Sequence, residues 1–282
     1  MRTRRTPRRS TRLLLAPVLA GLVALTGCTT GSSAGNSQAE ARQSQLNKVI
    51  KRGTVRVAVL PDFPPYAVQK PNGEYAGYEI EVAHRLADAM GVKLKMVSTN
   101  GTNRLSLLQS DRVDVNISSW TATDERAKNA GFTIPYSAHG ASLLFKKSDP
   151  IKGYDDLDGK TVSVARGSTN DTIMTENFPR TKVTRFETIA DAIAALKSGK
   201  VDAAVESYTT VRNEAKKSSN LEALDAPPLD PALVSMGVLQ GDQVWMNYLN
   251  NFIRNFIASG EDEKLYKKWI GTDLPSIVTQ VP

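Results

Sequence analysis

The sequence has few of the side chains that carry metal or nucleophilic chemistry, with one cysteine and two histidines in 282 residues. A single cysteine forms no disulfide within the chain, and together with two histidines it makes no zinc-type cluster. No catalytic constellation stands out among the remaining residues. We therefore expect no metal site, no cofactor and no enzymatic activity.

The sequence also lacks a basic surface of the kind that binds nucleic acid. The formal net charge is +7, but the residues before Cys28 contain six arginines and no acidic residue, which leaves a net charge of +1 on the rest. No basic stripe with interleaved aromatic residues occurs after this point. A nucleic-acid partner is therefore not expected.

The N-terminus has a charged start followed by an apolar stretch, Leu13 to Leu25, that is too short to span a membrane, for which about 20 residues are needed. We predict a signal peptide over residues 1–27. The segment Leu25–Cys28 resembles the lipobox of bacterial lipoproteins, which implies that the thiol of Cys28 carries a lipid, such as a palmitate-containing diacylglyceryl group. The alternative is an ordinary buried cysteine.

A polar run rich in Gly and Ser follows Cys28, and residues 28–47 are predicted to form a flexible tether. With the lipobox, this predicts a protein held on the outer face of the cell membrane through lipidated Cys28.

The remainder of the chain shows alternating strand and helix patterns. Residues 54–60 alternate as a strand does, residues 79–90 place apolar side chains at helical spacing with Gly91 as the cap, and residues 92–97 form another strand. This order predicts an α/β fold with a mainly parallel sheet.

Two segments of the chain resemble one another. Residues 107–115 and 195–203 each read as a helix end, a turn, a basic residue, Val-Asp and a strand. Either the chain contains two similar α/β lobes, or the match reflects the shared composition of such junctions. Five residues after Asp114 and Asp202 come Ser119 and Ser207, beyond the predicted strand ends where ligands bind in open α/β sheets.

The segment from Ile117 to Arg126 combines a strand end, several hydroxyl groups and an arginine at a helix start. Hydroxyl groups and free helix amides can donate to a carboxylate, and Arg126 can bind it through two nitrogens. Alternatively, Thr123 only caps the helix and Arg126 is solvated.

The sequence resembles the polar amino-acid class of bacterial extracellular solute-binding proteins, which are related to the ligand cores of ionotropic glutamate receptors. The resemblance runs from about Lys48 to Gly271 and rests on six ordered motifs. They are Asp62–Tyr66 (DFPPY), Gly77–Ala83 (GYEIEVA), Thr121–Arg126 (TATDER), Phe132–Tyr136 (FTIPY), Leu157–Val162 (LDGKTV) and Leu265–Trp269 (LYKKW).

The resemblance implies a two-lobed α/β fold of the periplasmic-binding-protein type. Each lobe would hold a mainly parallel sheet flanked by helices, and two crossover strands would serve as the hinge. Lobe 1 would comprise residues 48–138 and 238–282, and lobe 2 residues 139–237.

The resemblance also implies roles for particular residues. Phe63 would stack on the body of the ligand, although it could instead only pack in the core. Thr121 and Arg126 would hold an α-carboxylate, and Ser119 would accept from an α-ammonium. In the second lobe, the turn at Arg166–Asn170 (RGSTN) would close over the carboxylate, with Ser168 and Thr169 in contact.

The sequence departs from the family pattern at one position. The family usually places an aspartate five residues after Asp202 to pair with the α-ammonium, and here that residue is Ser207. Glu206 is the neighbouring carboxylate, but consecutive strand residues point in opposite directions unless the strand has ended or bulged. Both Glu206 and Ser207 are therefore candidates.

Arg104 falls where some family members that bind acidic amino acids place an arginine for the ligand's side-chain carboxylate. An acidic ligand is thus one candidate, and a structural role for Arg104 in bracing its loop is the alternative.

The expected function is a monomeric receptor that binds a polar amino acid and delivers it to an ABC permease. Two alternatives remain: an enzyme similar to the cyclohexadienyl dehydratases, which use the same scaffold, and a ligand sensor that serves no transporter.

Overall fold

The computed structural model describes residues 43–280. The predicted signal peptide, Cys28 and most of the predicted tether lie outside the described residues. The first elements are α2 (Gln45–Arg52), β1 (Thr54–Val59), β2 (Asp62–Phe63), β3 (Ala67–Gln69), β4 (Tyr75–Ala76), α3 (Tyr78–Met90), β5 (Lys93–Ser98), α4 (Arg104–Gln109), β6 (Val115–Thr121) and α5 (Asp124–Ala127).

The chain then crosses to a second group of elements through a long strand, β7, and returns through β12. These elements are β7 (Gly131–Lys146), the 3-10 helix η1 (Tyr154–Leu157), β8 (Thr161–Ala165), α6 (Thr169–Asn177), β9 (Lys182–Phe186), α7 (Ile189–Ser198), β10 (Ala203–Ser207), α8 (Tyr208–Lys216), β11 (Leu221–Ala223) and β12 (Leu229–Val238). The C-terminal helices are α9 (Gln243–Ala258), α10 (Glu261–Ile270) and α11 (Ser276–Thr279).

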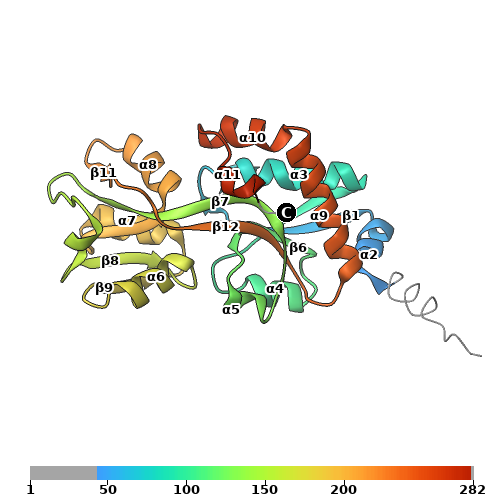
Figure 1. Cartoon of the computed structure of the whole chain (residues 1–282), viewed down its shortest axis with the longest axis horizontal. Helices are drawn as coiled ribbons and strands as arrows, with labels where there is room; N and C mark the ends of the chain where they lie inside the picture. The colour runs from blue at the N-terminus through green and yellow to red at the C-terminus, as the bar shows by residue number, and fades with distance from the viewer. Residues whose placement is uncertain (1–42, 281–282) are drawn as a thin grey trace, which may run out of the picture.

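The main sheet has the strand order β5-β1-β6-β12-β7-β10-β8-β9, with β11 also paired to β7. On one side β1 pairs in parallel with β5 and β6, and on the other β8 pairs in parallel with β9 and β10. Between them β7 and β12 run antiparallel. We call the elements around β5-β1-β6, together with the C-terminal helices, lobe 1, and those around β10-β8-β9 lobe 2. The strands β7 and β12 join the lobes, as Figure 1 shows, and the expected two-lobed α/β fold is confirmed.

The helical periodicity at residues 79–90 correctly predicts α3, and Gly91 ends it in the left-handed conformation with φ 64°. The sequence predicted that the tether ends at residue 47, which is too late. The helix α2 begins at Gln45, because Ser44 caps it and the Asp242 carboxylate accepts from the Gln45 amide at 2.6 Å. Residues 45–47 therefore belong to the folded protein.

The two similar sequence segments form equivalent junctions in the two lobes. The Arg56 amide at β1 donates to the carboxylate of Asp114 at 2.6 Å, and the Thr161 amide at β8 donates to Asp202 at 2.7 Å. The amide of each aspartate donates back to the carbonyl of the same partner residue at 2.8 Å. Each Val-Asp pair thus ties the start of one parallel strand to the next, and the internal repeat is structural.

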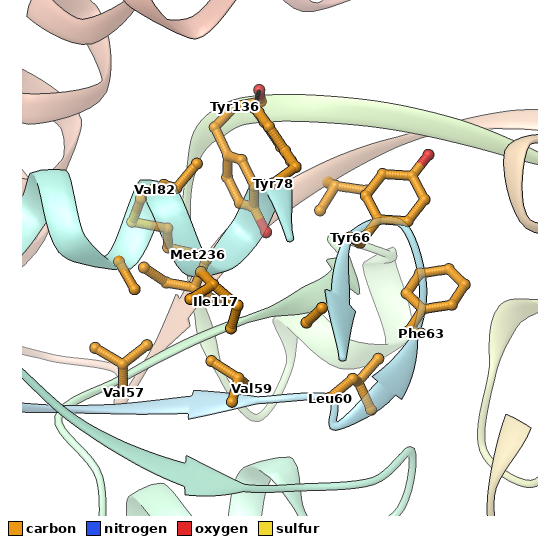
Figure 2. Close-up of a cluster of buried hydrophobic side chains, with 14 of the residues drawn as sticks. Val57, Val59, Leu60, Phe63, Tyr66, Tyr78, Val82, Ile117, Tyr136 and Met236 are labelled. Carbon is orange, nitrogen blue, oxygen red and sulfur yellow. Dashed lines mark hydrogen bonds between the residues drawn. The ribbon is translucent and has the colours of Figure 1, made fainter. Parts of the chain in front are cut away.

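The core of lobe 1 lies between its sheet and α3. Figure 2 shows that the strands contribute Val57, Val59 and Ile117, the helix contributes Tyr78 and Val82, and the joining strands contribute Tyr136 and Met236; all are buried. Phe63 and Tyr66 sit at one edge of this cluster, on the segment that follows β1. The core therefore fixes the segment that carries Phe63.

Within residues 43–280, no helix has the length and apolar character needed to cross a membrane. The same part of the chain contains no group of three or more His, Cys, Asp or Glu residues placed to hold a metal ion.

Candidate functional site

A cavity lies between the two lobes and gathers the predicted site residues. Of these, only Ser207 does not line it. The lining residues are Leu60, Asp62, Phe63, Asn100, Gly101, Arg104, Ser119, Thr121, Arg126, His139, Ala165, Ser168, Thr169, Asn170, Glu187, Thr188, Ile189 and Glu206. The cavity has a volume of about 40 Å³.

Arg126 connects the two lobes across this cavity. Thr123 caps the short helix α5 and accepts from the Arg126 amide at 3.3 Å, which fixes the backbone of the arginine. The guanidinium donates through Nη1 to the Thr121 carbonyl at 3.0 Å and through Nη2 to the Gly167 carbonyl of lobe 2 at 2.9 Å. Burial lowers the pKa of Arg126 to about 10, so the group stays charged at neutral pH.

Lobe 2 presents a helix N-terminus to Arg126. Ser168 caps α6 by accepting from the Asp171 amide at 3.1 Å, and Ser168, Thr169 and Asn170 all line the cavity. The free amides of a first helical turn carry partial positive charge and bind anions. Arg126 and the start of α6 together make this part of the cavity suited to a carboxylate.

Ser119 is held by a buried carboxylate beneath the cavity. It adopts a positive φ of 48°, and its amide and hydroxyl donate to Glu79 Oε1 at 2.6 and 2.9 Å. The Tyr136 hydroxyl donates to the same oxygen at 2.6 Å, and burial raises the pKa of Glu79. Because the Ser119 hydroxyl donates to Glu79, its lone pairs and the carbonyl remain as acceptors for a ligand.

Arg104 both braces the protein and faces the cavity. Its Nε and Nη2 donate to the hydroxyl and carbonyl of Ser118 at 3.2 and 2.9 Å, which accounts for the bracing role. It also lines the cavity, and burial together with the charge of Arg126 lowers its pKa to about 10. The two sequence interpretations of Arg104 are therefore compatible.

Glu206, and not Ser207, reaches the cavity. Glu206 Oε2 accepts from the Ser207 amide at 2.8 Å, and Oε1 accepts from Asn170 Nδ2 at 3.4 Å. Burial raises the pKa of Glu206 to about 7. Ser207 instead caps α8, where its hydroxyl accepts from the Thr210 amide at 3.2 Å. The inclusion of Ser207 among the lining residues is thus corrected.

Phe63 is buried, and its ring stacks on Tyr66 at a centroid distance of 4.9 Å while also lining the cavity. Core packing therefore describes its surroundings, and its place in the cavity wall leaves stacking on a ligand a prediction.

Sequence reasoning missed His139 and Asn170 as cavity residues. Burial and the charges of Arg104 and Arg126 lower the pKa of His139 to about 4, so its ring is neutral at pH 7. His139 lies on β7, and no local pattern marks a residue that enters a site from a joining strand. Asn170 lay within the turn identified from the sequence, next to Ser168 and Thr169.

These features define a two-lobed binding protein with a polar cleft between its lobes. The chain belongs to the bacterial extracellular solute-binding proteins, family 3, whose family model matches residues 55–272.

Three curated relatives match most of the chain. The L-cystine-binding protein TcyJ of Escherichia coli K12 is 29% identical over 83% of this chain and 89% of its own length. The ABC transporter glutamine-binding protein GlnH of Bacillus subtilis 168 is 28% identical, over 90% of this chain and 95% of its own. A cyclohexadienyl dehydratase of Pseudomonas aeruginosa is 25% identical, over 82% of this chain and 88% of its own.

Solved structures agree with this assignment. A solute receptor for L-cysteine of Neisseria gonorrhoeae superposes with a TM-score of 0.76 at 27% identity, covering 79% of this chain and 92% of that one. A mutant of the protein ArgBP from T. maritima gives a TM-score of 0.75 at 30% identity, covering 81% of this chain and all of that one. Proteins that include a solute receptor thus share the fold over about four fifths of this chain.

Proposed function

We propose that this protein is an extracytoplasmic receptor that binds a polar amino acid between its lobes. The observation that carries the proposal is the pairing of opposite charges within one closed cavity. Arg126 and the start of α6 supply positive groups for an α-carboxylate, while Glu206 and the Ser119 acceptors serve the α-ammonium. The relatives named for cystine and glutamine support this ligand class.

Hydrogen bonds between the lobes stabilise the closed arrangement, and a ligand that contacts both lobes would favour it further. Besides the bond from Arg126 to Gly167, the Ala190 amide of lobe 2 donates to Asp62 of lobe 1 at 3.1 Å. A ligand shifts the equilibrium between open and closed forms only by binding one of them better, and the groups from both lobes surround it only after closure. In this proposal β7 and β12 are the hinge, with lobe boundaries near residues 138 and 238.

An acidic amino acid is one candidate ligand, because Arg104 and Arg126 both line the cavity. If Arg104 binds a side-chain carboxylate, Arg104→Ala weakens binding of aspartate or glutamate by about tenfold or more, since charge-assisted hydrogen bonds contribute about 1.5–3 kcal/mol. Binding of neutral amino acids changes less. Calorimetric titration of both proteins with acidic and neutral ligands measures the difference, and unchanged affinity for acidic ligands removes this candidate.

The cellular setting is also part of the proposal. Export by the signal peptide, lipidation of Cys28 and a flexible tether would keep the monomeric receptor at the outer face of the membrane. Delivery to an ABC permease is part of the proposal and is supported by the family and by the relative named as an ABC transporter glutamine-binding protein. Tethering would raise the effective concentration of the receptor at the permease.

One observation favours a second candidate function. Glu206 is a buried carboxyl with a pKa raised to about 7, a value suited to a general acid, and a cyclohexadienyl dehydratase is among the relatives. Turnover of prephenate or arogenate by the purified protein would establish this activity, and the Glu206→Gln protein should then be inactive.

The binding proposal is tested by a thermal-shift panel on the protein lacking residues 1–28. A specific ligand raises the melting temperature by mass action, whereas compounds that do not bind leave it unchanged. We expect one or a few polar amino acids to raise it, among all amino acids, polyamines and organic acids. A response to polyamines or to organic acids without an amino group, and to no amino acid, contradicts the proposal.

A further inference from the structure

A second and larger pocket lies on the other side of the joining strands. It has a volume of about 470 Å³, within the range of about 300–1,000 Å³ typical of small-molecule sites. One wall is α8 of lobe 2, and the other is formed by α10, α11 and the segment between them in lobe 1. Figure 1 shows these helices on one side of β7 and β12, and α4, α5 and α6 on the other. We call it the back pocket.

A thin partition separates the back pocket from the cleft. Phe63 lines the cleft, Pro65 lines the back pocket, and His139 of β7 lines both. The partition is attached to α8, since the Thr210 hydroxyl donates to the Pro64 carbonyl at 3.2 Å. Movement of α8 relative to lobe 1 would therefore displace wall residues of both the cleft and the back pocket.

The walls of the back pocket are apolar and aromatic, with positive charge on one side. Tyr208 and Trp269 face it from the two lobes, alongside Tyr266, Ile270, Ile277 and the prolines 65, 228, 231 and 275. The only charged residues among its described lining residues are Arg212 and Lys216, both on α8. The Arg212 guanidinium lies over the Tyr208 ring at 4.3 Å, and it pairs at 3.2 Å with Asp225, whose side chain is 99% exposed.

We propose that the back pocket binds a small aromatic carboxylate and that its occupation favours the closed receptor. The aromatic ring matches the tyrosine, tryptophan and proline walls. The carboxylate matches the two cations of α8, because the described lining holds no acidic residue and the Asp225 partner of Arg212 is solvent-exposed. The back pocket and the cleft lie on opposite sides of the joining strands. Opening the cleft therefore brings the two walls of the back pocket together. A molecule that fits the pocket of the closed form holds the walls apart, and by reciprocity it raises the affinity of the cleft for its own ligand.

The site is tested with an aromatic anion, 1-anilinonaphthalene-8-sulfonate, whose fluorescence rises in apolar surroundings. The full chain carries Cys28→Ser, so that no lipid contributes. We expect the double variant Arg212→Ala/Lys216→Ala to bind the probe at least about tenfold more weakly, as expected for the loss of charge-assisted contacts. The matched control, Lys93→Ala/Lys95→Ala, removes two exposed cations of the edge strand β5 and should bind as the parent does.

Three outcomes overturn the site. The first is equal affinity in both double variants. The second is loss of probe binding in Arg104→Ala, which would place the probe in the cleft, because Arg104 lines the cleft but its hydrogen bonds to Ser118 stay within lobe 1. The third is a dimer that only Arg212→Ala/Lys216→Ala dissolves, which would make a second copy of the chain the occupant.

Coupling to closure is tested by spin labels at Lys95→Cys and Lys182→Cys in the Cys28→Ser chain. These positions lie on β5 and β9, the two ends of the main sheet. We expect the probe to increase the fraction of molecules in which the distance between the two labels is that of the closed form. This increase should be absent in the Arg212→Ala/Lys216→Ala variant. An unchanged distance distribution with the probe bound, or a shift towards the open form, overturns the coupling. Since no cleft ligand is added, this result is independent of the proposed amino-acid specificity.

Discussion

At the scale of single residues, Glu206 determines how the proposed site responds to pH. Its pKa is raised to about 7 by burial in the unliganded cavity. A ligand ammonium beside it would stabilise the carboxylate and lower this pKa, so the deprotonated protein binds better. Affinity should therefore be constant above pH 7 and fall below it, by up to about tenfold per pH unit.

Calorimetric titrations between pH 5.5 and 8.5 measure this dependence. The Glu206→Gln protein should bind more weakly at pH 8 and show no fall below pH 7. Glu187→Gln is the matched control, because Glu187 also lines the cavity but is largely exposed and pairs with Arg166 at 2.7 Å. A flat profile for the unaltered protein would show that Glu206 does not contact an ammonium.

The choice between Glu206 and Ser207 also marks the limit of prediction at this scale. The sequence placed a polar cavity residue near the end of β10, because the Val-Asp pair before β6 repeats before β10, and Glu206 lines the cavity there. Which of two consecutive side chains reaches the cavity depends on where the strand ends and α8 begins. That boundary is set by Ser207, whose hydroxyl accepts from the Thr210 amide and so caps α8.

At the scale of elements, the two Val-Asp junctions differ in their charge partners. Asp114 is fully buried and pairs with Arg52 at 2.5 Å and with Arg56 at 2.7 Å. The Asp202 carboxylate accepts from the Thr161 amide and has no ion pair within residues 43–280. We expect Asp114→Asn to lower the free energy of unfolding by about 3 kcal/mol, because two arginines lose a buried partner. Asp202→Asn retains an acceptor and should cost about 1 kcal/mol. Urea unfolding of the two variants measures the difference, and equal losses would contradict it.

Elements with strong local patterns were predictable, and those defined by distant pairing were not. The periodicity of α3 and the glycine at its end depend only on neighbouring residues, so both were found. The 16 residues of β7 pair with β12, β10 and β11, which are all far away in the sequence. The length of β7 and the position of His139 in the cavity wall follow from that pairing and have no local signal.

At the scale of the whole molecule, Gly101 of lobe 1 and Gly167 of lobe 2 approach each other closely where the lobes meet. A Cβ atom at Gly101 of lobe 1 would lie 2.3 Å from the Arg166 carbonyl oxygen of lobe 2, which is too close for the closed form. Gly101→Ala should therefore leave the melting temperature without ligand unchanged. It should weaken ligand binding by about 100-fold, as expected when the free energy of the closed form rises by about 3 kcal/mol.

Thermal-shift assays with and without ligand separate these two effects. Gly153→Ala is the control, since Gly153 has an extended φ of −164° and no atom within 4 Å of an added Cβ. A normal ligand-induced shift in Gly101→Ala would mean that the lobes need not approach this closely.

The most direct measurement is the calorimetric affinity of the Arg126→Met protein for the amino acid that gives the largest thermal shift. Methionine keeps much of the side-chain length but removes the charge and both donors to Thr121 and Gly167. If Arg126 holds the ligand carboxylate, affinity falls at least about 100-fold, as expected for loss of a charged pair worth about 3 kcal/mol. An affinity within about twofold of the unaltered protein, a difference of only about 0.4 kcal/mol, would contradict the proposed binding site.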